Sequence, residues 1–213
     1  MPIDPMRVTV WYAQSIRTAF TARSPTARST QPEHGLTDEV LGSTDVLTLR
    51  GYRVHKRVAD EVVVRVQQHV LNGTGLIVLH SGNESKIFTR LTGTTCALRW
   101  READDHEHVW TVNPNHSIAA GIPSPPVVPA QETYGEFFDI PQPDELAFLS
   151  TFSGGGFFTA GAASGAAGAG SSASVTAARP VPSNTGRQSA ACWQTLSVGR
   201  TADRGIARRD TRR

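Results

Sequence analysis

The chain has 213 residues, of which 38% are hydrophobic and 19% charged, a composition that suits one globular domain with a segment that adds little to a core. Its formal net charge of +2 combines an acidic part, residues 1–150, with a basic remainder in which eight arginines are balanced only by Asp203 and Asp210. Cys96 and Cys192 lie in these two unlike parts without a metal-ligand spacing, which argues against a disulfide framework and fits a reducing compartment.

The segments with a clear hydrophobic pattern alternate between strands and helices. In chain order we expect a strand, a short helix, a strand, a longer helix, a strand and a short helix, over residues 7–11, 36–41, 45–49, 58–71, 76–79 and 85–91. The longer helix has valines four residues apart from Val58 to Val70, which form one apolar stripe. Further strands are predicted over 96–100, 108–112 and 146–150. This order predicts an α/β fold with a mostly parallel sheet, right-handed crossovers and three layers.

Three stretches do not follow this pattern. Residues 12–31 have no acidic residue and no helical period, and the proline-rich stretch 123–129 is expected to be an ordered loop or an edge. Residues 160–178 are almost wholly Ala, Gly and Ser. We therefore predict a domain over 1–152 and a disordered tail over 153–213, because the tail cannot bury enough apolar area to offset its ordering entropy.

The same features limit the partners and the compartment. The arginines of the tail are mostly scattered, which argues against a nucleic-acid partner. No apolar run approaches the roughly 18 residues of a membrane span. The start lacks the basic and apolar regions of a signal peptide. We therefore expect a cytoplasmic protein without a membrane partner.

The most informative stretch reads Gly-Leu-Ile-Val-Leu-His-Ser-Gly-Asn-Glu-Ser-Lys over residues 75–86. Its aliphatic run is typical of a strand buried on both faces of a parallel sheet. Ligands bind outside the carboxyl ends of such strands, and His80 stands at this end. His55 follows the strand 45–49 at an equivalent level. An imidazole there can bind a metal, transfer a proton or bond a sugar hydroxyl, or it can simply bond a neighbouring carbonyl, and position alone leaves these alternatives open.

A second candidate stretch runs from Tyr134 to Asp139 and combines aromatic side chains with carboxylates. Aromatic faces and acidic acceptors suit carbohydrate, whose ring hydrogens stack while its hydroxyls donate. The alternative is a strand edge, with Phe137 or Phe138 in the core and Glu136 outside. Glu136 is the strongest candidate carboxylate for a site.

Several stretches together resemble the ThuA family, named for trehalose utilisation. They are Pro-Glu-His-Gly-Leu-Thr at 32–37, Gly-Leu-Ile-Val-Leu-His-Ser-Gly at 75–82, Ser-Lys-Ile-Phe at 85–88, Leu-Thr-Gly-Thr-Thr-Cys-Ala-Leu-Arg-Trp-Arg-Glu at 91–102 and Tyr-Gly-Glu-Phe-Phe-Asp-Ile-Pro at 134–141. The resemblance implies a flavodoxin-like α/β sandwich of the class I glutamine amidotransferase-like superfamily. It also implies a role in trehalose or related disaccharide use.

The chain departs from the family pattern at several histidines. Tyr52 stands where the family has the first His of a Trp-Trp-Gly-His-x-x-His stretch, and Asn83 and Glu84 replace a His and an aromatic residue. The family's later Gly-His-Glu stretch has no counterpart after residue 152. Two histidines do not make a competent site for a divalent ion, which wants three or four ligands. We therefore expect no metal and no cofactor, although the family leaves a divalent metal possible.

The missing last stretch and the odd tail composition fit one hypothesis, a frameshift near Gly154, with another out-of-frame stretch within 12–31. No Cys stands at residues 79–83 and no His follows His116, which argues against a thiol-based glutamine amidotransferase. Cys96 is expected to be a small buried hydrophobe.

Residues and resemblance together assign His80 and Glu136 as a proton-handling pair. The expected substrate-binding residues are His55, Ser81, Asn83, Lys86 and Tyr134. The expected partner is a small carbohydrate. A non-catalytic sugar-binding or regulatory module and a truncated, inactive gene product remain open as alternatives, and so do the enzymatic status and the oligomeric state.

Overall fold

The structure is a computed structural model. It describes residues 6–12, 26–28, 30–50, 54–116, 119–122, 127–128, 132–143, 145–162 and 173–175. Most of the stretch 12–31 and most of the tail therefore lie outside the described residues.

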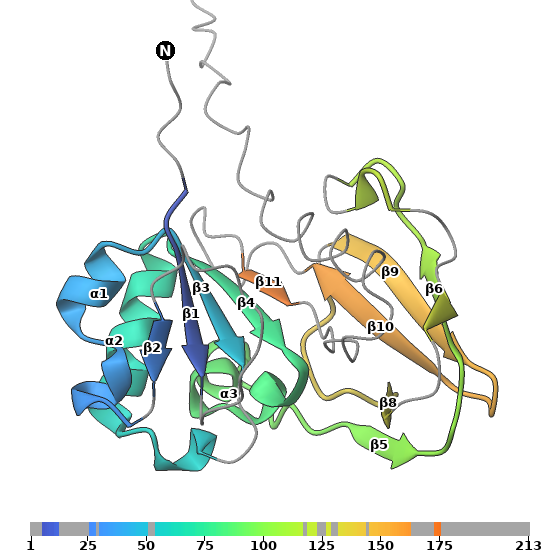
Figure 1. Cartoon of the computed structure of the whole chain (residues 1–213), viewed down its shortest axis with the longest axis horizontal. Helices are drawn as coiled ribbons and strands as arrows, with labels where there is room; N and C mark the ends of the chain where they lie inside the picture. Colours follow the sequence, from blue (N-terminus) through green and yellow to red (C-terminus); the bar gives the residue numbers. More distant parts are fainter. Residues whose placement is uncertain are drawn as a thin grey trace, which may run out of the picture.

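A five-stranded parallel sheet forms the first half of the fold (Figure 1). Its spatial order is β11-β4-β3-β1-β2. The strands are β1 (Val8–Tyr12), β2 (Thr26–Arg28), β3 (Val46–Arg50), β4 (Gly75–Leu79) and β11 (Ala173–Val175). In register, Trp11 lies beside Leu49 and Leu49 beside Val78. The three strands predicted over 7–11, 45–49 and 76–79 are confirmed within one residue at their ends.

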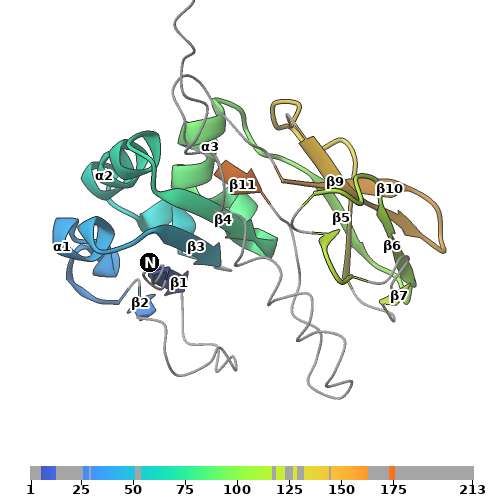
Figure 2. The same cartoon turned by 90° about the horizontal axis from the view of Figure 1, so that it is seen from above.

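Three helices cover one face of this sheet, as Figure 2 shows. They are α1 (Asp38–Gly42), α2 (Asp60–Leu71) and α3 (Lys86–Thr92). Helices α1 and α2 belong to connections that run across the sheet in the same direction, so right-handed crossovers place them on the same face. The parallel α/β sheet is thus confirmed, whereas the described residues show helices on one face only. The flavodoxin-like three-layer arrangement stays a prediction.

Side-chain caps explain where the two short helices begin. The Thr37 hydroxyl accepts a bond from the Val40 amide at 3.3 Å, and the Ser85 hydroxyl accepts one from the Phe88 amide at 3.1 Å. Helix α2 has no side-chain cap and is held by its valine stripe, which is buried. Three 3-10 turns complete this half. They are η1 (Pro32–Gly35), η2 (His55–Arg57) and η3 (His80–Glu84).

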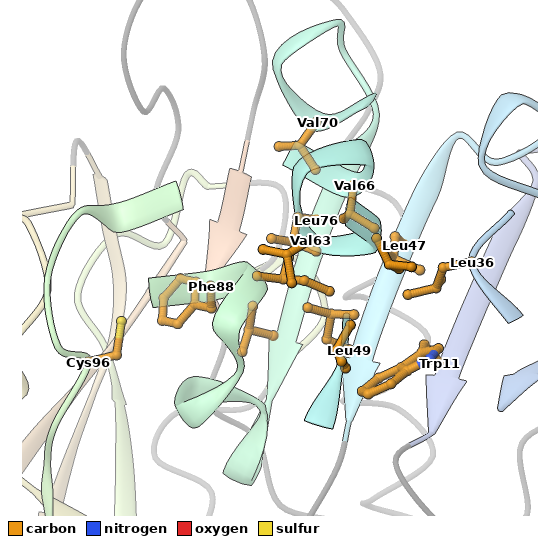
Figure 3. Packing of buried hydrophobic residues seen from close by; sticks show 14 of the residues in the cluster. Trp11, Leu36, Leu47, Leu49, Val63, Val66, Val70, Leu76, Phe88 and Cys96 are labelled. Carbon is orange, nitrogen blue, oxygen red and sulfur yellow. The ribbon is translucent and has the colours of Figure 1, made fainter. Parts of the chain in front are cut away.

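The main core lies between the helices and the sheet (Figure 3). Trp11, Leu49 and Leu76 from the strands pack with Val66 of α2 and Phe88 of α3, and all five side chains are buried. The alternate strand residues Val10, Thr48, Ile77 and Leu79 are buried as well. Both faces of the parallel sheet are therefore covered, as the continuous apolar runs predict.

Two antiparallel sheets form the second half. A two-stranded sheet pairs β5 (Arg99–Glu102) with β8 (Glu132–Gly135). A four-stranded sheet has the order β10-β9-β6-β7. Its strands are β6 (Glu107–Thr111), β7 (Val127–Val128), β9 (Glu145–Phe152) and β10 (Phe157–Ala162). These sheets are a departure from the mostly parallel fold expected.

The smaller elements test three further predictions. The strands expected over 108–112 and 146–150 are confirmed as β6 and β9, whereas the one expected over 96–100 begins later, at Arg99. Cys96 precedes it in a left-handed conformation, with φ of 53°. The proline-rich stretch supplies the edge strand β7, in line with the expected loop or edge.

Two parts of the expected disordered tail form strands instead. Strand β10 pairs with β9 and buries Phe158 in the main core, and β11 extends the parallel sheet beside β4. The prediction used the average composition of 153–213. That average does not reflect the Phe-Phe-Thr segment, which supplies aromatic side chains before the Ala- and Gly-rich run begins. The rest of the tail lies outside the described residues. The frameshift near Gly154 stays a hypothesis.

Candidate functional site at the carboxyl edge of the parallel sheet

The order of the parallel strands marks one place where a ligand would be expected. Strand β2 lies on one side of β1 and β3 on the other, so the direction of the chain across the sheet reverses between β1 and β3. Open α/β sheets bind ligands outside the carboxyl ends of the strands at such a switch point. Here these ends are Tyr12 and Arg50.

A tryptophan and two histidines meet at this edge. His55 of η2 is only 4% exposed, and its ring centroid lies 5.6 Å from that of Trp11 at an interplanar angle of 41°. The Trp11 indole N–H donates to the His34 carbonyl at 2.9 Å. His34 Nε2 accepts a bond from the Ala59 amide at 3.3 Å, next to the start of α2. Trp11 thus connects η1 with η2.

The turn η1 has an unusual backbone. Glu33 and His34 have φ of 50° and 56°, and Gly35 follows with φ of 71°. Such left-handed conformations cost roughly 1–2 kcal/mol for a residue with a side chain. The bonds to Trp11 and Ala59 hold the turn in place. Strained residues fixed by their surroundings often mark functional sites.

The turn η3 is pressed against the end of β3. A Cβ atom on Gly82 would lie 2.9 Å from the Leu49 carbonyl oxygen and 3.0 Å from Val78 Cγ1, so any other residue would force the turn or the strand to shift. His80 and Ser81 are the first two residues of η3 and follow β4 directly. Their side chains lie outside the part that the structure describes.

Asn83 and Cys96 are tied to each other. The buried Asn83 side chain donates from Nδ2 to the Cys96 carbonyl at 3.2 Å, and so fastens η3 to the segment before β5. The Cys96 thiol is buried beside the Thr92 hydroxyl, and this burial raises its pKa. Cys96 is therefore the inert buried hydrophobe that was expected.

Lys86 joins two helices at the same edge. Its Nζ donates to the Val58 carbonyl at 2.8 Å and forms an ion pair with Asp60, the first residue of α2. The bond and the charge of Lys86 lower the pKa of Asp60. The ammonium group therefore fixes the chain between η2 and α2 against the start of α3.

Tyr134 and Glu136 lie in the antiparallel half. Tyr134 is on β8 and contacts the Phe158 ring edge-on, with centroids 6.2 Å apart. The Glu136 carboxylate accepts from the Phe138 amide at 3.0 Å, from the Thr159 amide at 3.0 Å and from the Thr159 hydroxyl at 2.7 Å. These bonds fasten the end of β8 to β10.

The neighbours of Glu136 match the strand-edge alternative. Phe138 is buried in the core, whereas Phe137 is 85% exposed. The Asp139 carboxylate accepts from the Thr95 hydroxyl and amide, and these bonds lower its pKa. Both carboxylates of this stretch thus have protein donors.

Of the predicted site residues, the structure brings His55, Lys86, Asn83 and the backbone of η3 to one edge of the parallel sheet. It places Tyr134 and Glu136 on other elements. Trp11 and His34 were not selected from the sequence, although the Pro-Glu-His-Gly stretch and the aromatic residue near the end of the first strand carried the signal. Among the described residues, no three His, Cys, Asp or Glu side chains are arranged to hold a metal ion.

None of the helices in the described ranges has both the length and the apolar character needed to cross a membrane.

Comparisons with known proteins agree with this architecture. The chain is similar in structure to a cytoplasmic protein of Salmonella typhimurium, with a TM-score of 0.53, 11% identity, and coverage of 90% of this chain and 97% of the other. It is also similar to a ThuA-like protein of Bacteroides uniformis, with a TM-score of 0.50, 15% identity, and coverage of 68% and 67%. At these identities the likeness concerns the fold. The search of curated proteins found no match.

The sequence model of the ThuA family, described as trehalose utilisation, matches residues 9–164. The match covers well over half of the chain, including the first strand and β10. The chain therefore belongs to the ThuA family.

Proposed function

We propose that this chain binds a sugar derivative of the trehalose class at the carboxyl edge of its parallel sheet, over η2 and η3, and that His80 handles a proton there. The observation that carries the proposal is the convergence of η1, η2 and η3 at the switch point between β1 and β3. The family description supports the class of ligand.

The described contacts suggest how the site is divided. His55 is almost fully buried against Trp11, so it supports the floor of the site rather than extending into solvent. His80 and Ser81 follow strand β4 directly and are the residues nearest its carboxyl end. An imidazole near neutrality suits general acid–base chemistry on an oxidised sugar.

Glu136 fits the proton-handling role less well than His80. Its carboxylate already accepts three bonds, two of them from Thr159. We therefore propose a structural role for Glu136 in joining β8 to β10, and the same for Lys86 and Asn83 at the other edge. The chemistry then depends on His80.

A second candidate function is sugar binding without turnover. The observation that favours it is Asn83, which stands where the family has a histidine and which is committed to the Cys96 carbonyl. Binding without chemistry would suit a regulatory module of the cytoplasm. The similar Salmonella protein, which is described as cytoplasmic, supports that compartment.

Calorimetry with trehalose and with its 3-keto derivative tests the proposal on the full chain. We expect the wild type to bind at least one of them, and both His80→Gln and His55→Gln to weaken binding at least tenfold. The control His106→Gln removes an exposed imidazole outside the site and should bind as the wild type does. Absence of binding by the folded wild type, or equal binding by all variants, would overturn the proposal.

Turnover separates the two candidate functions. If the chain is an enzyme, the 3-keto derivative is consumed by the wild type and not by His80→Gln. If it is a binding module, both proteins bind it and neither consumes it.

A further inference from the structure

The four-stranded sheet β10-β9-β6-β7 has two apolar faces. The inner face contributes Phe148, Phe152 and Phe158, all of them buried. On the outer face, cross-strand partners form a continuous row from β10 to β7, namely Phe157, Thr151, His108 and Val127. Trp110 and Val112 follow His108 at alternate positions on the same side. The outer face is thus a continuous surface over all four strands.

This outer face is apolar although it is exposed. Phe157 is 50% exposed, Val112 49%, Val127 48% and Trp110 44%. These are four of the seven large hydrophobic side chains exposed among the described residues. Phe137 adjoins them, because the Glu136 amide beside it donates to the Phe157 carbonyl at 3.1 Å. An antiparallel sheet with one solvated face normally has polar residues there, so this face is expected to have a partner.

Two aromatic side chains of the face, Trp110 and His108, have contacts that restrict their positions. The Trp110 indole N–H donates to the Thr151 hydroxyl of β9 at 2.9 Å. The His108 ring lies beside it, nearly parallel at 20°, with centroids 6.4 Å apart. A side chain that is already fixed loses little entropy when it becomes part of an interface.

The charges of the face limit the class of partner that it can bind. Among the outward positions described on these four strands, Glu145 alone has a formal charge, and it lies at the far end of β9 beside His116, 3.4 Å away. Aromatic enrichment without charge is typical of the centre of a protein–protein interface. A nucleic-acid surface would be basic, and small ligands prefer concave sites. The face therefore suits an equally apolar protein surface.

The exposed area of the face sets the expected strength of its association with a partner. At the exposed fractions above, Trp110, Phe157 and the neighbouring Phe137 expose on the order of 350 Å², and Val112 and Val127 add roughly 150 Å², so each copy offers about 500 Å². Two copies in contact would bury about 1,000 Å² in total, more than most crystal contacts and slightly less than a standard stable complex. This size fits weak association.

We propose that the outer face of the four-stranded sheet is the contact of a weak, symmetric homodimer, in which two copies pack face to face. A second copy supplies the aromatic surface that this face requires, and the nearest carboxylate, Glu136, already accepts from the outward Thr159. A symmetric contact closes at two chains, with the Thr151–His108 part of the row near its centre. The proposal concerns the antiparallel half and does not depend on the sugar site.

Sedimentation velocity of the full chain between 2 and 200 µM tests this dimer. We expect the wild type to shift from monomer to dimer with a dissociation constant on the order of 10 µM. The double variant Phe157→Thr/Val127→Thr keeps good strand formers on the face and should raise the dissociation constant at least tenfold. The matched control Leu71→Gln removes another exposed hydrophobe, at the end of α2, and should dimerise as the wild type does.

A charge variant keeps the test decisive if the double variant fails to fold. Val127→Lys lies on the edge strand β7, where lysine is well tolerated, and it would bring unfavourable charges to the contact. We expect this variant to stay monomeric at 200 µM with an unchanged circular dichroism spectrum. A wild type that is monomeric throughout, a wild type that forms open-ended aggregates, or a folded Val127→Lys that dimerises normally would each overturn the proposal.

Discussion

The fit of η3 against β3 gives the sharpest stability prediction, the effect of Gly82→Ala. The added methyl group would meet the Leu49 carbonyl oxygen at 2.9 Å and Val78 Cγ1 at 3.0 Å. The first of these atoms belongs to the backbone of a central strand and cannot rotate away. Overpacking of this kind costs about 1–3 kcal/mol, and the backbone contact places Gly82→Ala near the upper value. The turn that contains His80 must then move outward.

Urea unfolding followed by circular dichroism measures this cost. We expect the free energy of unfolding to fall by about 2–3 kcal/mol, which lowers the melting temperature of a chain of this size by about 5–10 °C. Gly42→Ala is the matched control, because no atom lies within 4 Å of its added Cβ and the position is helical. The control should be neutral or slightly stabilising. If the two variants differ by less than about 0.5 kcal/mol, η3 is not pressed against β3 and the argument fails.

Two further predictions concern pH. Burial raises the pKa of Glu107 above its usual 4.5, although the Ser150 hydroxyl donates to the carboxylate. The folded state therefore binds the proton more tightly than the unfolded state does. The stability that this proton confers is lost as pH rises through the folded pKa. Glu107→Gln should accordingly be more stable than the wild type at pH 8 in urea unfolding, and an advantage that is equally large at pH 4 would contradict this. Burial alone would raise the pKa of Asp105, but the bonds from Arg101 and the Gly154 amide outweigh it and the pKa is lowered. Asp105→Asn should therefore lower the free energy of unfolding at pH 7, and this loss of stability should shrink below about pH 3.8. A loss that does not change with pH would refute the role of the charge.

The elements that the sequence predicts well are those whose pattern is long or whose caps are explicit. Strand β4 has a continuous aliphatic run, α2 has its valine stripe, and Thr37 and Ser85 mark helix starts. Strands β2 and β11 have three residues each, too few for any period to emerge. Their place is set by pairing with β1 and β4, which a local pattern does not contain.

The candidate site also has parts that the sequence predicts and parts that it does not. The end of β4 and the place of His55 could be predicted, because the carboxyl ends of parallel strands meet at one edge. The roles of Lys86 and Asn83 could not, because a polar side chain near a strand end can bond a ligand or a distant carbonyl equally well. Lys86 bonds Val58 and Asn83 bonds Cys96, contacts that only the folded chain reveals.

The pairing of β11 with β4 has a consequence for the order of folding. Both antiparallel sheets lie in the chain between these two neighbouring strands, so their pairing closes a loop of about 90 residues at a cost near 4 kcal/mol. Closing the shorter connection between β3 and β4 costs about 1 kcal/mol less and brings together five residue pairs instead of three. We expect β1, β3 and β4 to associate early and β11 to join last, so amide hydrogens of β11 should exchange faster than those of β3.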